Sequence, residues 1–141
     1  MFRNLATRPL LLAATRMAMF RNIEYNEIQT ISNIMVTKQS DPTFFVVDVR
    51  TPDEVTNTGI IPGAINVPLD QFETAFELQT PDAFKKQYGV ERPTGASHTM
   101  VVYCHMGGRS VRGAALAEKL GFEDVLNYSG GMSEWMSHNQ K

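Results

Sequence analysis

Short apolar runs alternate with amphipathic stretches along most of this chain. Residues 44–49 and 100–103 are largely apolar and β-branched or aromatic, a pattern typical of strands that are buried on both faces of a parallel sheet. Residues 64–67 and 124–127 predict two further short strands. Apolar positions three and four residues apart predict amphipathic helices over residues 25–35 and 110–120, and Gly121 is a typical stop for the second.

The remaining segments supply helices and turns between these strands. Residues 69–88 predict a helical stretch that is broken near Pro81, residues 89–98 predict a polar loop, and a last short helix is expected around Trp135. Short apolar strands that are separated by helices favour an α/β fold in three layers, with a mostly parallel central sheet and helices on both faces.

Composition and charge narrow the possible functions. The 141 residues are 43% hydrophobic and 20% charged, as expected for one globular domain. A net charge of −2 argues against nucleic acid or a membrane surface as the partner. The single cysteine, Cys104, excludes an internal disulfide, and the scattered histidines show no ligand spacing, so we expect neither a metal site nor a cofactor. The oligomeric state is not predicted.

The first 22 residues differ in charge from the rest. They contain four arginines and no acidic residue, whereas residues 23–141 carry nine basic and fifteen acidic residues, a net charge of −6. A cationic, acid-free and partly amphipathic beginning is typical of a mitochondrial presequence. We therefore expect residues 1–22 to be a presequence or an N-terminal appendage, residues 23–141 to form the domain, and the protein to be mitochondrial. An N-terminal helix lying on the domain of a cytoplasmic protein is the alternative.

The segment around Cys104 carries the most chemical information. A buried strand ends at this thiol, and a loop with two glycines then leads into a helix. The carboxyl edge of a parallel sheet is where ligands bind, and the amides at a helix N-terminus attract anions. A thiolate in this position, close to Arg109, would be stabilised and therefore nucleophilic.

Four motifs in this order resemble those of single-domain rhodaneses, the sulfurtransferases. They are VVDVRTPDE at residues 46–54, GIIPGAINVP at 59–68, CHMGGRS at 104–110, and LGFEDV at 120–125, which continues to YSGGMSEW at 128–135. The motifs lie between residues 46 and 135, and the resemblance covers roughly residues 23–138. Four motifs in register are far more specific than a lone cysteine followed by glycines.

The resemblance implies a mechanism through a cysteine persulfide. Cys104 would take sulfane sulfur from thiosulfate or a persulfide and pass it to an external thiol or to cyanide; glutathione and a protein thiol are the expected thiol acceptors. Arg109 would hold the charge of a small anionic donor, and loop amides would surround the transferred sulfur. The implied substrate-binding residues are His105, Met106, Gly107, Gly108, Arg109 and Ser110, and the implied supporting residues are Asp48, Arg50 and Trp135. Ser110 is expected to be the helix N-cap rather than a nucleophile.

Two functions other than sulfur transfer are alternatives for a chain with this cysteine loop. A Cdc25-like cysteine phosphatase also holds a thiolate in a loop of amides, but such enzymes carry Arg six positions after Cys, where this chain has Ser110. A catalytically inactive module of the same fold would bind a partner, although it would need neither Cys104 nor Arg109. Sulfur transfer is therefore the favoured hypothesis.

Overall fold

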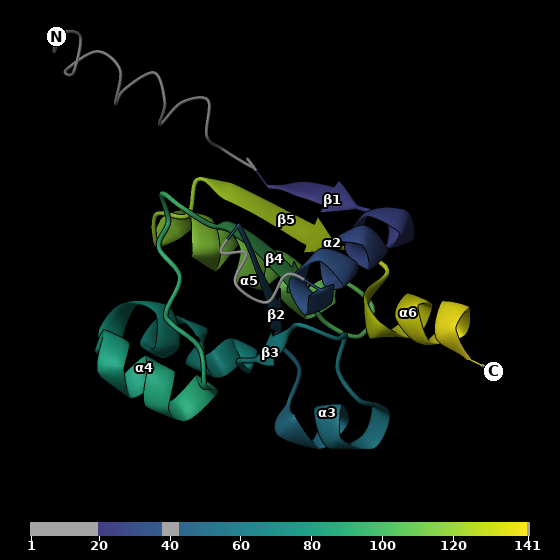
Figure 1. Ribbon diagram of the computed structural model, residues 1–141, viewed down its shortest axis with the longest axis horizontal. Coiled ribbons are helices and arrows are strands. Elements are labelled where there is room, and N and C mark those ends of the chain that lie inside the picture. Colours follow the sequence, from purple (N-terminus) through teal and green to yellow (C-terminus); the bar gives the residue numbers. More distant parts are fainter. Residues whose placement is uncertain (1–19, 38–42, 141) are drawn as a thin grey trace, which may run out of the picture.

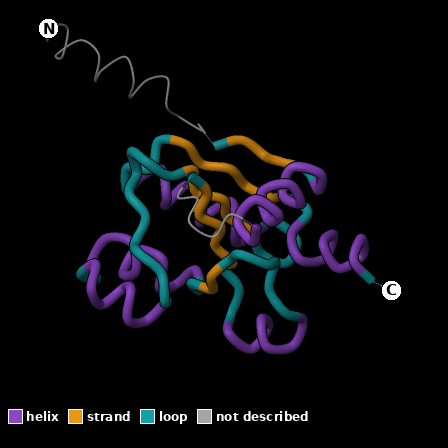
Figure 2. Tube along the Cα trace, in the orientation of Figure 1, coloured by secondary structure: helices purple, strands orange, loops and turns teal. Residues whose placement is uncertain are grey.

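A five-stranded parallel sheet forms the centre of the protein. The computed structural model describes residues 20–37 and 43–140. The strands are β1 (Arg21–Ile23), β2 (Phe44–Asp48), β3 (Ile65–Asn66), β4 (Thr99–Tyr103) and β5 (Asp124–Tyr128). Their order is β1-β5-β4-β2-β3, and all neighbouring pairs are parallel. The side-by-side strands are seen in Figure 2.

Helices cover both faces of this sheet. They are α2 (Tyr25–Thr37), α3 (Pro52–Thr58), α4 (Pro81–Tyr88), α5 (Gly108–Lys119) and α6 (Gly131–Asn139), with a 3₁₀ turn at Leu69–Gln71 and a π turn at Thr74–Leu78. In Figure 1, α2 lies in front of the sheet and α5 behind it. The predicted three-layer α/β fold is confirmed.

Two hydrophobic clusters, one on each face, hold the layers together. The alternation of side chains along β4 sends Met100 and Val102 to the face covered by α5, and Val101 and Tyr103 to the face covered by α2 and α6. Because β4 is buried on both sides, its sequence is a continuous apolar run. The central position of β4 also places its carboxyl end, where Cys104 follows, in the middle of the sheet edge.

Two elements differ from the sequence-based expectation. Strand β1 begins at Arg21, so the boundary expected between residues 22 and 23 falls inside a strand of the sheet. Residues 1–19 of the expected presequence lie outside the described part of the chain. Helix α3 occupies a segment for which no helix was predicted, and it begins with Thr51 as its N-cap and Pro52 in its first turn.

Candidate active site

Cys104 lies at the carboxyl edge of the sheet, between strand β4 and helix α5. The period of two along β4 turns its side chain to the same face as Val102, toward α5. The residue is only 1% exposed, yet it lies at the bottom of an open pocket. This pocket is lined by Cys104, His105, Met106, Gly108, Arg109 and Arg112. Cys104 therefore borders a surface hollow although almost none of its own surface is exposed.

The loop after Cys104 folds back so that its donors surround the sulfur. The amide of Gly107 donates a hydrogen bond to Sγ at 3.0 Å, and the amide of Ser110 donates one at 3.4 Å. The hydroxyl oxygen of Ser110 is 3.5 Å from the same sulfur. Donors from the first turn of α5 thus face a single atom, an arrangement that stabilises negative charge on it.

Gly107 allows the loop after Cys104 to fold back around the sulfur. Its φ of 105° lies in the left-handed region, where a side chain would be strained, and the residue is the N-cap of α5. A Cβ at this position would lie 3.0 Å from the carbonyl oxygen of Ser129. The close approach of the loop to the turn before α6 therefore also favours glycine.

These hydrogen bonds decide the ionisation of Cys104. Burial by itself raises the pKa of the thiol. The hydrogen bond with the hydroxyl of Ser110, and those from the amides of Ser110, Gly107 and Met106, outweigh burial and hold the pKa below its ordinary value. Thiolate is therefore formed at lower pH than in a free cysteine, as a nucleophile requires.

The start of helix α6 fixes the back of the loop. The amide of Met132 donates to the carbonyl oxygen of Cys104 at 2.8 Å, and the amide of Ser133 donates to that of His105 at 3.1 Å. Gly131, with φ 64°, lets the two segments meet, because a Cβ there would lie 2.6 Å from the oxygen of Cys104. These contacts hold the two carbonyls against α6, which leaves the loop amides to face the sulfur.

Arg109 is paired with a carboxylate from a distant helix. Its two terminal nitrogens lie 2.7 and 2.9 Å from the two carboxylate oxygens of Glu54, in the bidentate geometry of a strong ion pair. Glu54 also accepts from the amide and hydroxyl of Thr51, which completes the capping box of α3. Hydrogen bonds from Arg109, with smaller effects of those from Thr51, lower the pKa of Glu54 to about 2 against an opposing effect of burial.

Glu54 was not among the residues singled out from the sequence. The signal was present, because Thr51 followed three residues later by Glu54 is the capping-box pattern. Its contact with Arg109 spans 55 positions and becomes visible only in the folded chain.

Asp48 and Arg50 form a buried ion pair beneath α3. The guanidinium of Arg50 donates to both carboxylate oxygens of Asp48 and to the carbonyl of Gly59, and the Asp48 and Arg50 side chains are 0% and 1% exposed. Arg50 also donates to the hydroxyl of Thr58. The pair thus ties the end of β2 to the end of α3, the helix that presents Glu54 to Arg109. This geometry agrees with a supporting role rather than direct contact with a substrate.

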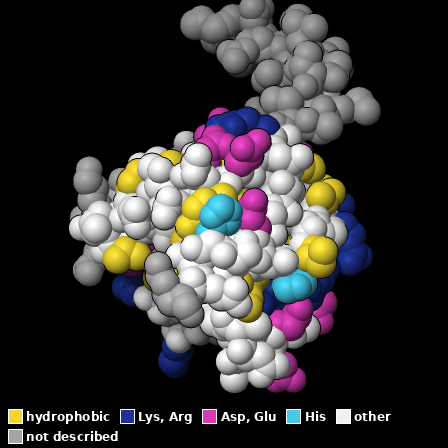
Figure 3. All heavy atoms as spheres, turned by 90° about the vertical axis from the view of Figure 1, so that its right-hand side faces the viewer, with side chains coloured by type: hydrophobic (Ala, Val, Ile, Leu, Met, Phe, Trp, Pro, Cys, Tyr) yellow, Lys and Arg dark blue, Asp and Glu magenta, His cyan; other side chains and the backbone are white. Residues whose placement is uncertain are grey.

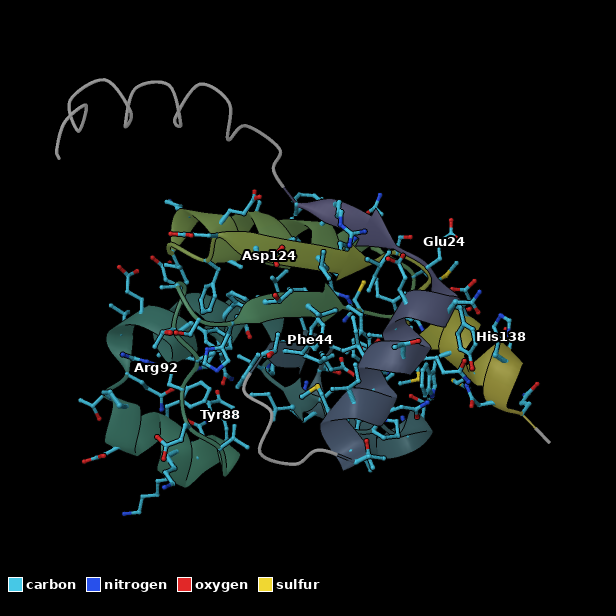
Figure 4. All side chains as sticks on the ribbon, turned by 45° about the horizontal axis from the view of Figure 1, so that its top comes forward. Glu24, Phe44, Tyr88, Arg92, Asp124 and His138 are labelled. Carbon is cyan, nitrogen blue, oxygen red and sulfur yellow. The ribbon has the colours of Figure 1, made fainter. Side chains whose placement is uncertain are left out.

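The helix-capping role expected for Ser110 and the position expected for Trp135 differ from the structure. The N-cap of α5 is Gly107, not Ser110, because the helix begins two residues earlier than the apolar pattern indicates. Trp135 does not line the Cys104 pocket; it lies on α6 with its ring 5.6 Å from that of Tyr25. His138, one turn further along α6, stacks on Tyr25 at the end of the molecule labelled by Glu24 and His138 in Figure 4.

The other expected residues surround the thiol. Met106 is 73% exposed at the rim, and His105 is half-buried in the pocket wall. Arg112, which was not among the expected site residues, also lines the pocket. Within residues 20–37 and 43–140 there is no group of three or more His, Cys, Asp or Glu side chains that could hold a metal ion. No helix within the same ranges is long and apolar enough to cross a membrane.

Comparisons with known proteins agree with this geometry. A family model described as a rhodanese-like domain matches residues 31–138. The human thiosulfate:glutathione sulfurtransferase is 37% identical over 89 residues, which cover 63% of this chain and 76% of that protein. A relative from Schizosaccharomyces pombe whose name places it in mitochondria is 31% identical over 115 residues, which cover 82% of this chain and 79% of its own.

A solved structure shows the same fold. The human single-domain sulfurtransferase TSTD1 superposes with a TM-score of 0.71 at 28% sequence identity. The superposition covers 84% of this chain and 97% of the human one.

Proposed function

Because the chain belongs to the rhodanese-like family, we propose that it is a sulfurtransferase in which Cys104 carries sulfane sulfur from an anionic donor to an external thiol. The observation that carries this proposal is the position of the Cys104 sulfur, 3.0 and 3.4 Å from the amides of Gly107 and Ser110. Such donors stabilise the attacking thiolate, and they are also placed to surround one additional sulfur atom.

The first half-reaction loads the cysteine. The Cys104 thiolate attacks the outer sulfur of thiosulfate, the sulfur–sulfur bond of the donor breaks, and sulfite leaves with the electron pair. A persulfide remains on Cys104, and its terminal sulfur carries the negative charge. The loop amides stabilise that charge, as the oxyanion hole of an acyl-transfer enzyme stabilises an oxygen. Arg109, paired with Glu54, lines the pocket in which the donor is held.

The second half-reaction needs a separate molecule as the sulfur acceptor. The 141 residues hold one cysteine, so an internal disulfide cannot release the sulfur. An acceptor thiolate attacks the terminal sulfur of the persulfide, and Cys104 leaves as the stabilised thiolate. Glutathione is the acceptor suggested by the name of the human relative, and cyanide or a protein thiol is the alternative. Alternating donor and acceptor steps of this kind give ping-pong kinetics.

A steady-state assay separates this function from phosphatase chemistry. We expect transfer of sulfur from thiosulfate to glutathione or cyanide, and no efficient hydrolysis of p-nitrophenyl phosphate. Ser110 occupies the position of the phosphatase arginine, and its amide and hydroxyl already face the sulfur. Efficient phosphate hydrolysis without sulfur transfer would reverse the assignment, and the absence of both activities would favour an inactive binding module.

We also propose that the protein acts in mitochondria. Four arginines and no acidic residue among the first 22 positions support this location, as does the name of the S. pombe relative. A fluorescent fusion of the whole chain should colocalise with mitochondria. A fusion that lacks residues 1–19 keeps strand β1 and should remain in the cytosol; mitochondrial import of this shorter fusion would contradict the proposal.

A further inference from the structure

The cations near Cys104 differ in whether an acidic partner neutralises them. Arg50 is buried against Asp48, and Arg109 is held by both oxygens of Glu54. Arg112 lines the same pocket, is exposed, and has no carboxylate within ion-pair distance among the described residues. On the face shown in Figure 3, Lys and Arg side chains also lie in small separate groups, several of them beside acidic ones. Within residues 20–37 and 43–140, Arg112 is thus a cation of the Cys104 pocket that no carboxylate neutralises.

A second hollow on helix α5 shares Arg112 with the Cys104 pocket. This hollow is lined by Leu69, Arg112, Ala115, Leu116 and Lys119, so Arg112 belongs to both depressions. Positions 112, 115, 116 and 119 follow the three- and four-residue spacing of one helix face. Lys119 comes seven residues after Arg112, which places its Cα about 10 Å further along the axis. Lys119 has no ion-pair partner among the described residues either.

We propose that this surface of α5 is the binding site of the acceptor thiol, with Arg112 and Lys119 as the groups that hold its carboxylates. The inference rests on the proposed sulfurtransferase function and extends it to the acceptor. The site fits a small peptide-like thiol that has its sulfur at Cys104, one carboxylate at Arg112 and a second carboxylate toward Lys119. Glutathione has these groups and is the probe that we choose.

Charge and surface chemistry support an acidic acceptor of this size. Residues 23–141 carry a net charge of −6, so an anionic ligand is repelled by most of the domain and needs a local positive site. Leu69 and Leu116 supply apolar walls along which the aliphatic part of a short peptide can lie. The guanidinium of Arg112 matches the planar geometry of a carboxylate.

The bound acceptor reacts without any further reagent. Its thiolate attacks the terminal sulfur of the Cys104 persulfide, a new sulfur–sulfur bond forms, and the bond within the persulfide breaks. Cys104 departs with the electron pair as a thiolate, and the product is the hydropersulfide of the acceptor. Arg112 takes no part in bond making; it is a specificity-determining residue that positions the acceptor.

A comparison of two acceptors tests this proposal. The wild-type protein and the Arg112→Gln, Lys119→Gln and Lys86→Gln variants are assayed with thiosulfate as donor and either glutathione or 2-mercaptoethanol as acceptor. Lys86 is an exposed lysine on α4 with no ion-pair partner among the described residues, and it serves as the matched control. We expect Arg112→Gln to raise the KM for glutathione relative to that for 2-mercaptoethanol by about 3- to 10-fold. Lys119→Gln should raise the ratio by a smaller factor, and Lys86→Gln should leave it unchanged.

Ionic strength provides a second measurement. Added salt should raise the KM of the wild-type protein for glutathione, and this dependence should be weaker in Arg112→Gln, because salt screens exposed charges. An unchanged ratio of the two KM values in Arg112→Gln would overturn the proposal. A larger effect of Arg112→Gln on the KM for thiosulfate than on that for glutathione would overturn it as well, since the cation would then bind the donor. The absence of sulfur transfer to either thiol by the wild-type protein would refute the proposed function itself.

Discussion

Arg109, which lines the Cys104 pocket, donates two hydrogen bonds of 2.7 and 2.9 Å to the carboxylate of Glu54. The resemblance implied Arg109 as the cation that binds the donor, and in the folded chain its guanidinium is paired with the carboxylate of Glu54. The pair therefore acts as a fixed dipole at the pocket wall rather than as a free positive charge. Its stability depends on α3, because Glu54 is also part of the capping box of that helix.

Replacement of Glu54 by Gln separates its ion pair with Arg109 from its part in the capping box of α3. Glutamine can still complete a capping box, but it carries no charge. The freed Arg109 should lower the KM for thiosulfate by about 2- to 5-fold, the range expected for a partly exposed ion pair. Steady-state kinetics with thiosulfate provide the measurement. A rise in KM would show instead that Glu54 is needed to position Arg109.

The free energy of unfolding should depend on pH through the ion pair of Glu54 with Arg109. The pKa of Glu54 is lowered from 4.5 to about 2, so its contribution to folding is fully present above pH 4.5 and is lost as the pH falls through about 2. Glu54→Gln should therefore narrow the difference in stability between pH 6 and pH 3. Urea denaturation at the two pH values measures this, and an identical difference in both proteins would argue against the ion pair.

Ser110 should control the ionisation of the nucleophile. Among the hydrogen bonds that lower the pKa of Cys104, the one with the hydroxyl of Ser110 has the largest effect. Replacement by alanine should raise the pKa of the thiol, so the pH profile of alkylation by iodoacetamide should move to higher pH and the rate at neutral pH should fall. A profile that does not move would show that the amides of Gly107 and Ser110 are sufficient to stabilise the thiolate.

Gly131 should be needed for the geometry of the loop. Its φ of 64° alone disfavours alanine by about 1–3 kcal/mol, and a Cβ would overlap the carbonyl oxygens of Cys104 and His105. Gly131→Ala should therefore lower both the unfolding free energy and kcat. Gly108→Ala is the control for stability, because Gly108 is helical and a Cβ at this position would meet no atom within 4 Å. Equal stability of the two variants would contradict the close approach of α6 to the loop.

The buried pair of Asp48 and Arg50 should contribute to stability. Asp48→Ala leaves the guanidinium of Arg50 without its carboxylate at 1% exposure, and such a loss costs about 3–5 kcal/mol. Arg21→Ala, which removes an exposed pair with Glu27, should cost less than about 1 kcal/mol. Chemical denaturation of both variants gives the comparison. A small effect of Asp48→Ala would mean that the hydrogen bonds of Arg50 to Thr58 and Gly59 are enough to stabilise its buried charge.

Secondary structure could be predicted from the sequence where burial alone determines the pattern of apolar residues. The strand before Cys104 and the helix after it could be predicted, because burial on both faces and a single apolar helix face leave clear periodic patterns. Strand β1 could not be predicted, because its three residues include Arg21 and Asn22 and depend on pairing with β5. The contact of Arg109 with Glu54 and the position of Trp135 likewise depend on packing between distant elements.

The mass of the intact protein tests the central claim most directly. After incubation with thiosulfate and removal of excess donor, the wild-type protein should gain about 32 Da, the mass of one sulfur atom in a persulfide. The Cys104→Ser variant should gain nothing, and glutathione should return the loaded wild-type protein to its original mass. A wild-type protein that stays at its original mass, or a Cys104→Ser variant that gains sulfur, would contradict a persulfide on Cys104.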